Sequence, residues 1–112
     1  MPQQNSSFSS IQQALLIPAF EAIVALLKEK GVQATVSSTD DSRKVSFVGK
    51  NGKECEFGCW ISAAEKFRIY QHFVRPAREH ENAGTDMSGA FASDINPETI
   101  VRAFKSHFRY HI

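Results

Sequence analysis

Two cysteines and two histidines with four-residue spacing are the residues in this chain that first suggest chemistry. Cys55 and Cys59 lie in one segment, and His107 and His111 lie in another. Zn²⁺ is bound in proteins by thiolate sulfur and imidazole nitrogen in tetrahedral sites. Side chains four residues apart share one face of a helix, so the two histidines suit such a site if the C-terminal segment is helical.

The cysteine pair does not suit it. Cys55 and Cys59 belong to a β-rich segment, where residues four apart are separated by roughly 13 Å along the strand. Two thiolates on one zinc ion lie within about 4.6 Å of each other. The same separation excludes a disulfide while the strand is extended, because bridged Cα atoms lie within ~7 Å. We expect two free thiols, no cofactor and no metal, so the four residues are only weak zinc candidates.

A second candidate set combines cationic and aromatic side chains around a predicted strand from Lys66 to Val74. Alternation there directs Phe67, Ile69 and Phe73 inward. The residues that face outward or follow the strand are Arg68, Tyr70, His72, Arg75 and Arg78. Such residues on an exposed sheet face can bind single-stranded nucleic acid by stacking and phosphate contacts. Alternating polar residues are also typical of any half-solvated strand, and the net charge is only +1.

The third candidate is the segment from Ala77 to Ile95, which lacks sustained periodicity and is predicted to be a long loop. Its ionisable residues could perform acid–base chemistry with the preceding arginines if they were buried together. Polar residues are equally typical of a solvated loop. These loop residues are Glu79, His80, Glu81 and Asp86. The sequence contains no nucleophile elbow, phosphate-binding glycine loop or HExxH motif. Enzymatic activity is therefore not favoured, and we name no catalytic residue.

Length and composition indicate one domain. The chain has 112 residues, of which 42% are hydrophobic and 22% are charged, as is usual for a soluble globular protein. We expect a flexible N-terminal segment over residues 1–8 and a single domain over residues 9–112. The longest apolar run, Ala14 to Phe20, is far shorter than the ~20 residues of a membrane span and contains Pro18. No membrane partner is expected, and two unpaired cysteines favour the cytoplasm.

Apolar periodicity predicts a helix near each end of the domain. The N-terminal helix contains Pro18, so it either kinks there or ends at Ile17 and restarts with Pro18 in its first position. Gly31 suits its left-handed C-terminal cap. Asn96 can cap the C-terminal helix, with Pro97 in the first position. The two apolar stripes consist of Leu16, Phe20, Ile23, Val24 and Leu27, and of Ile100, Val101, Phe104 and Phe108.

Strands are predicted between these helices. Val32 to Ser38 alternates as a first strand, and Asn51-Gly52 predicts a hairpin with a two-residue type I′ turn. That turn pairs Lys50 with Lys53, which sets the register. One face of the hairpin then carries Val45, Phe47 and Trp60, and the other carries Val48, Cys55 and Phe57. Apolar side chains on both faces indicate that a partner covers one of them.

The predicted fold is α+β: an N-terminal helix, a three- to four-stranded antiparallel sheet, a long loop and a C-terminal helix packed on the sheet. The favoured function is a non-enzymatic protein-interaction module that self-associates as a homodimer or binds a protein partner through its sheet. Single-stranded nucleic-acid binding through the fourth strand is the alternative, and an enzyme or a zinc domain is less favoured. The candidate binding residues are Phe47, Trp60, Arg68, Tyr70, His72, Arg75 and Arg78.

Overall fold

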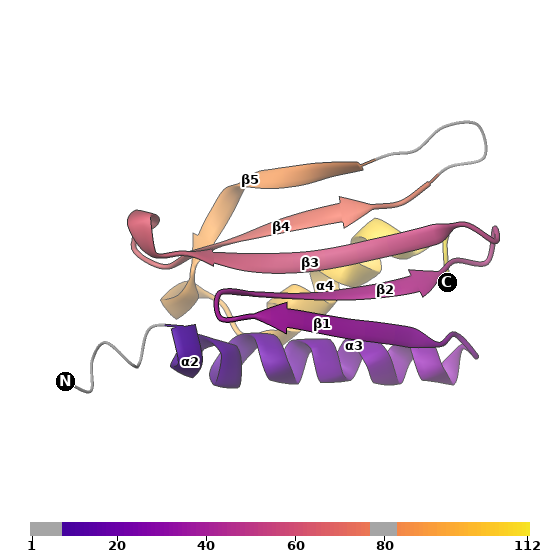
Figure 1. Ribbon diagram of the computed structural model, residues 1–112, viewed down its shortest axis with the longest axis horizontal. Coiled ribbons are helices and arrows are strands. Elements are labelled where there is room, and N and C mark those ends of the chain that lie inside the picture. Colours follow the sequence, from indigo (N-terminus) through magenta and orange to yellow (C-terminus); the bar gives the residue numbers. More distant parts are fainter. Residues whose placement is uncertain (1–7, 77–82) are drawn as a thin grey trace.

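The computed structural model describes residues 8–76 and 83–112, which form an α+β domain (Figure 1). Its antiparallel sheet has five strands in sequential order. The strands are β1 (Ala34–Thr39), β2 (Ser42–Val48), β3 (Glu54–Ser62), β4 (Arg68–Val74) and β5 (Ala83–Phe91). The predicted α+β class and the helix near each end are confirmed, but the sheet has one strand more than the upper prediction of four.

Both long helices cover the same face of the sheet. They are α3 (Ile17–Glu29) and α4 (Pro97–Phe108). Phe57 of β3 stacks on Phe20 of α3, with ring centroids 5.9 Å apart, and meets the edge of Phe104 of α4 at 5.5 Å. Because one strand residue contacts both helices, the core lies between this helix face and the helices. We call the opposite side of the sheet the open face.

The N-terminal helix passes through Pro18 without ending. The short helix α2 (Phe8–Ile11) leads into a π-helical segment η1 (Gln12–Leu16), which continues into α3. The N–H of Ile17 bonds to the carbonyl of Gln12. Proline has no N–H to donate, and its ring crowds the carbonyl four residues earlier, so the wider π turn before Pro18 accommodates it. The predicted cap at Gly31 is confirmed by its φ of +76°.

The combined helix Phe8–Glu29 is long and apolar enough to cross a membrane by length and composition. A core helix passes the same test, and four residues of α3 are buried in the domain, namely Ala19, Phe20, Ile23 and Leu27. Phe8 begins the helix and packs on Phe67 at 5.8 Å, so the expected flexible segment over residues 1–8 does not include Phe8. The rest of that segment, residues 1–7, lies outside the described residues.

The hairpin register differs from the predicted one by one residue. Phe47 pairs with Cys55 and Val45 with Phe57. The N–H of Gly49 bonds to Lys53 and that of Gly52 to Gly49, so the loop has three residues rather than two. Gly52, with a φ of +81°, takes the left-handed position of a type I turn followed by a bulge.

A one-residue shift moves every side chain of a strand to the other face. Val45 and Phe47 therefore lie on the helix face with Cys55 and Phe57, and not beside Trp60 as predicted. The hairpin does not carry a large apolar surface on both faces. The predicted apolar surface on both faces of the hairpin, from which a covering partner was expected, is therefore wrong.

The predicted long loop from Ala77 to Ile95 is also wrong in part, because it contains β5 and the 3₁₀ turn η3 (Ala92–Asp94). β5 pairs with β4, and its register shifts where Ile69 pairs with Ala90 but Gln71 pairs with Asp86. Such an irregular strand, which contains Gly84 and Gly89, has no alternating pattern to reveal it. Residues 77–82 lie outside the described residues.

The C-terminal helix begins as predicted. The side chain of Asn96 accepts a hydrogen bond from the N–H of Thr99 at 3.1 Å, and the hydroxyl of Thr99 accepts one from the N–H of Asn96 at 3.3 Å. This reciprocal cap, with Pro97 at the first turn, sets the start of α4. Its buried residues are Ile100, Val101, Phe104 and Phe108.

Candidate functional site

The structure separates the sequence-predicted binding residues into three places. Phe47 is in the core, 4% exposed, with its ring 5.8 Å from Phe104 and 5.4 Å from Phe108. It cannot contact a partner in the folded protein, because the register places it against α4. Arg75 lies on the helix side, where its guanidinium covers Phe73 at 4.5 Å and donates to His107 at 3.2 Å. Arg78, like Glu79, His80 and Glu81, lies outside the described residues.

The other predicted residues lie together on the open face. Trp60 of β3 pairs with Tyr70 of β4, and their rings stack with centroids 5.3 Å apart. Tyr70 is only 4% exposed, since Gly89 of β5 packs directly on it. A Cβ at Gly89 would lie 2.8 Å from Cε1 of Tyr70. The Tyr70 hydroxyl donates to Glu65, and this bond raises the pKa of Tyr70.

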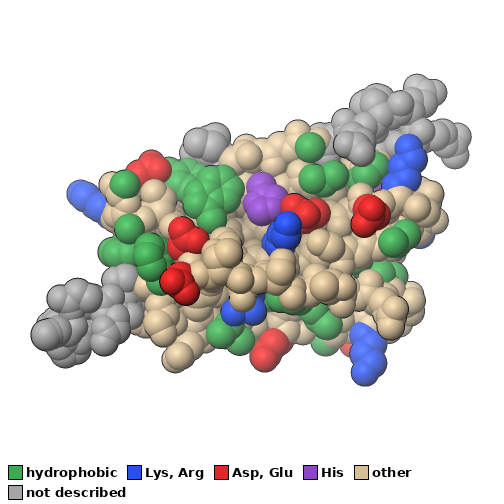
Figure 2. Space-filling model, in the orientation of Figure 1, with side chains coloured by type: hydrophobic (Ala, Val, Ile, Leu, Met, Phe, Trp, Pro, Cys, Tyr) green, Lys and Arg blue, Asp and Glu red, His purple; other side chains and the backbone are tan. Residues whose placement is uncertain are grey.

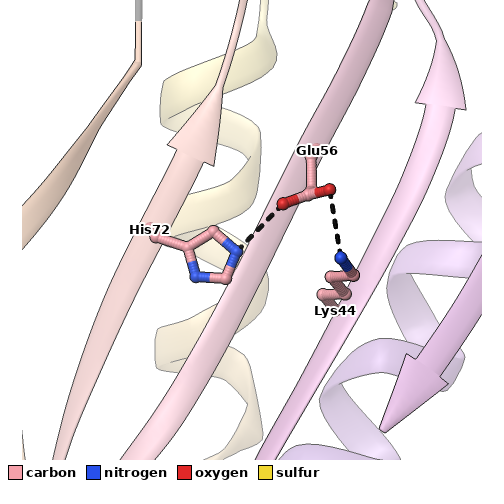
Figure 3. A network of polar contacts seen from close by, with 3 residues as sticks. All are labelled: Lys44, Glu56 and His72. Atoms are coloured by element: carbon pink, nitrogen blue, oxygen red, sulfur yellow. Dashed lines mark hydrogen bonds and ion pairs between the residues drawn. The ribbon is translucent and has the colours of Figure 1, made fainter.

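Three strands contribute one polar network to the centre of the open face (Figure 3). Glu56 of β3 lies between Lys44 of β2 at 3.4 Å and His72 of β4 at 3.2 Å. The imidazole of His72 lies over Gly58, where a Cβ would come within 2.5 Å of Cε1. The absence of a side chain at Gly58 is therefore what allows the His72 ring to lie over β3 and contact Glu56.

Charges of both signs are interspersed on the open face, as Figure 2 shows. Lys44 is paired with Glu56, and the guanidinium of Arg68 covers the ring of Phe91 at 4.3 Å. Tyr70 presents almost no ring surface to solvent. Among the residues that the structure describes, these features give a stacking ligand little aromatic surface beyond Trp60, and they provide no continuous basic track for phosphates.

The four zinc candidates do not converge. Cys55 and Cys59 are buried free thiols on the helix face, and burial raises the pKa of Cys59 to about 12. His107 stacks on Phe73 at 4.3 Å, and His111 bonds to the carbonyl of Pro76 at 3.3 Å. Over residues 8–76 and 83–112, the structure contains no group of three histidine, cysteine or carboxylate residues that could hold a metal ion.

The outer edge of β1 is a feature that the sequence did not reveal. The N–H of Gly49 bonds to Lys53 across the hairpin. In an antiparallel ladder, the backbone N–H and C=O groups of successive residues point alternately to the two sides of the strand. Counting back from Gly49, every second residue of β2 therefore bonds to β3. The intervening residues, which include Lys44 and Ser46, bond to β1.

In β1, residues that bond to β2 likewise alternate with residues whose backbone groups point away from β2. Thr35 pairs with Ser46 and Ser37 with Lys44, so their backbone groups bond to β2. The backbone N–H and C=O groups that point away from β2, outward from the edge of the sheet, are those of Ala34, Val36 and Ser38. β1 is the terminal strand of the sheet, and no other described strand pairs with these groups.

A groove runs beside this edge between β1 and α3. Its volume is about 310 Å³, and Figure 1 shows α3 running alongside β1. Val36 is 38% exposed in it, an unusual state for a valine whose strand covers a core. The residues that line it are Ile17, Phe20, Glu21, Val24, Val36 and Arg43.

Gln12 and Arg43 organise one end of this groove. Gln12 is 7% exposed, and its Nε2 donates to the carbonyls of Thr39 and Ser42, each at 3.1 Å, with Asp40 at 3.4 Å. Its Oε1 accepts a hydrogen bond from Nε of Arg43 at 3.1 Å. One buried amide thus ties the N-terminal helix to the β1–β2 turn and holds Arg43 in place.

No protein-family model, curated protein or solved structure matches this chain.

Proposed function

We propose that this chain is a non-enzymatic protein-interaction module whose β1 edge binds an extended strand of a partner protein. The single observation that carries the proposal is the row of outward backbone groups at Ala34, Val36 and Ser38. An extended peptide that pairs with such an edge gains a ladder of main-chain hydrogen bonds, and neighbouring pockets for its alternate side chains provide selectivity.

The composition of β1 supports this role. Exposed edge strands are usually protected by charge, by proline or by a bulge. β1 is ATVSST, six residues without charge or proline, and its register with β2 is regular throughout. All but the first of its residues are exposed. An edge of this kind is suited to accept another strand.

The groove supports a single strand as the occupant rather than a second copy of this chain. A strand added to β1 would place half of its side chains over Ile17, Phe20 and Val24 of α3. A second copy would bring its own α3 to the same position, where the two helices would compete for space. A strand without an attached helix avoids this competition, so a segment of a different protein is the occupant that we favour.

The open face supports the alternative, single-stranded nucleic-acid binding, less strongly. Trp60 is partly exposed and could stack on one base. Of the described cations, Lys44 and Arg68 lie nearby, and each already has a partner within the fold. A cytoplasmic location stays part of the proposal, because the thiols of Cys55 and Cys59 are unpaired.

The proposal is tested by selecting binders from a displayed library of random peptides long enough to pair with all of β1. Each selected peptide is then measured against the wild type, Ser38→Pro and Val48→Ala. Ser38→Pro removes an outward N–H, whereas Val48→Ala alters an exposed valine on the open face. We expect Ser38→Pro to abolish binding and Val48→Ala to retain it. No selected binder, or equal binding to Ser38→Pro, would contradict the proposal.

Sedimentation at high protein concentration tests the homodimer in the same way. A monomer at all concentrations agrees with a strand from another protein. A dimer that Ser38→Pro converts to a monomer would show that a second copy occupies the edge, and our choice of occupant would then be wrong.

A further inference from the structure

The side chain of Arg43 has unused hydrogen-bonding capacity beside the β1 edge. Its Nε is occupied by Gln12 at 3.1 Å. Neither of the ion pairs around Glu56, which join it to Lys44 and to His72, involves Arg43. Within residues 8–76 and 83–112, its two terminal Nη groups have no hydrogen-bond partner.

Gln12 fixes the orientation of this guanidinium. The amide of Gln12 is buried and is itself held by backbone carbonyls at the β1–β2 turn. An arginine bonded through Nε keeps its two Nη groups in a planar fork, the arrangement that binds both oxygens of a carboxylate. Because the fork is already oriented, less conformational entropy is lost when such a ligand binds.

Arg43 lines three cavities around this end of β1, two of which also border the N-terminal helix. One of these two is the groove with α3. The other is a depression of about 420 Å³ between the start of the helix and the β1–β2 turn. The depression also presents the side chains of Ser9, Gln13 and Thr39. A ligand at the edge of β1 would therefore pass within reach of Arg43.

The surrounding charges limit what this ligand can be. Glu21 borders the groove and Asp40 borders the depression, and both are exposed. Two carboxylates near one guanidinium disfavour a polyanion such as a nucleic acid or a phosphorylated segment. A single carboxylate, flanked by apolar side chains that fit Phe20 and Val24, is the complementary ligand.

We propose that Arg43 binds a carboxylate of the strand that pairs with β1. This inference rests on the proposed function and adds the chemistry by which the partner is selected. The carboxylate is either an Asp or Glu side chain or the C-terminal carboxylate of the partner, and both present the same two oxygens to the fork.

The test uses peptides that bind this chain, selected from two libraries. In one library the random segment is followed by further residues, and in the other it ends at a free C-terminus. For each binder, the acidic side chain is replaced by its amide, and separately the C-terminus is amidated. We expect one of these changes to weaken binding to the wild type on the order of tenfold, as a charge-assisted hydrogen bond requires. The change that does so identifies the source of the carboxylate.

The protein arm uses Arg43→Gln and Arg43→Lys. Arg43→Gln should bind acid and amide peptides equally, and Arg43→Lys should recover part of the difference. If Arg43→Gln does not fold, the measurements with acid and amide peptides on the wild type alone decide whether a carboxylate is bound. Binders that lose affinity for Ser38→Pro but are indifferent to both amide changes would overturn the role of Arg43 and leave the proposed function intact. Binders indifferent to Ser38→Pro would overturn the proposed function itself.

Discussion

Nε of Arg43 donates a hydrogen bond to Oε1 of Gln12 at 3.1 Å, between residues separated by 31 positions in the chain. The bond connects the helix that covers the core to the strand next to the open edge. It serves both the stability of the domain and the orientation of the arginine that we assign to ligand binding. These two roles can be separated experimentally.

Gln12→Ala should lower the free energy of unfolding by about 1–3 kcal/mol, because the carbonyls of Thr39 and Ser42 would lose a buried donor. Gln13→Ala is the matched control, because Gln13 is the next residue in the chain and its side chain is exposed. Urea denaturation measures both variants. Equal stabilities of the two would show that Gln12 does not tie the helix to the turn.

Proline at two adjacent positions in β1 should have unequal effects on stability. Ser37→Pro removes an N–H that bonds to β2 and should cost about 1–3 kcal/mol. Ser38→Pro removes an N–H that points out of the sheet, and proline is tolerated at such edge positions. Thermal unfolding of the two variants checks the assignment. If Ser38→Pro were the more damaging substitution, the outward direction that we assign to Ser38 would be wrong.

Gly58→Ala should destabilise the protein by about 1–3 kcal/mol, since the added Cβ would collide with the His72 ring and with Cβ of Lys44 at 2.9 Å. His72→Ala removes the first of these collisions. The double variant should therefore lose less stability than the sum of the two single variants. Additive losses in chemical denaturation would mean that His72 does not need the space above Gly58.

The buried thiol of Cys59 should make the stability of the protein fall at alkaline pH. Burial raises the pKa of this thiol from 9.0 to about 12. Its stabilising contribution is complete below pH 9.0, where the thiol is protonated in both states, and is lost as pH rises toward about 12 because only the unfolded state releases the proton. Over this window, the free energy of unfolding of the wild type should fall more steeply with pH than that of Cys59→Ala. The difference in slope should correspond to the release of about one proton on unfolding. Parallel slopes in denaturation series would contradict the burial of Cys59.

Local patterns allowed much of the fold to be predicted from the sequence. Asn96 and Pro97 marked the start of α4 correctly, and Gly31 marked the end of α3, because caps depend on neighbouring residues alone. The alternation that placed Ile69 and Phe73 inward in β4 is also confirmed by the pairing. These signals operate within a few residues of the chain.

The errors arose where local patterns permit two outcomes or carry no signal. Asn51-Gly52 fits both a two-residue turn and a three-residue loop with a bulge, and the choice moved Phe47 from a candidate binding residue into the core. β5 is formed by pairing with β4 despite its glycines, which sequence periodicity cannot show. The contact of Gln12 with Arg43 depends on the tertiary fold, so no spacing rule reveals it.

The chain's single tryptophan provides a way to distinguish the two candidate surfaces. Trp60 stacks on Tyr70 on the open face, away from the groove beside β1. A peptide that binds at the β1 edge should leave its fluorescence unchanged, whereas an oligonucleotide that stacks on the open face should quench it. Quenching by single-stranded nucleic acid at low salt, reversed by added salt, would favour the alternative function.

Amide hydrogen exchange in β1, measured by NMR with and without a selected peptide, tests the central claim most directly. In the free protein, the outward amides of Val36 and Ser38 should exchange quickly and that of Ser37 slowly. When the peptide binds, Val36 and Ser38 should become protected, because their N–H groups then bond to the added strand. Unchanged exchange at Val36 and Ser38 in the bound protein would contradict the account.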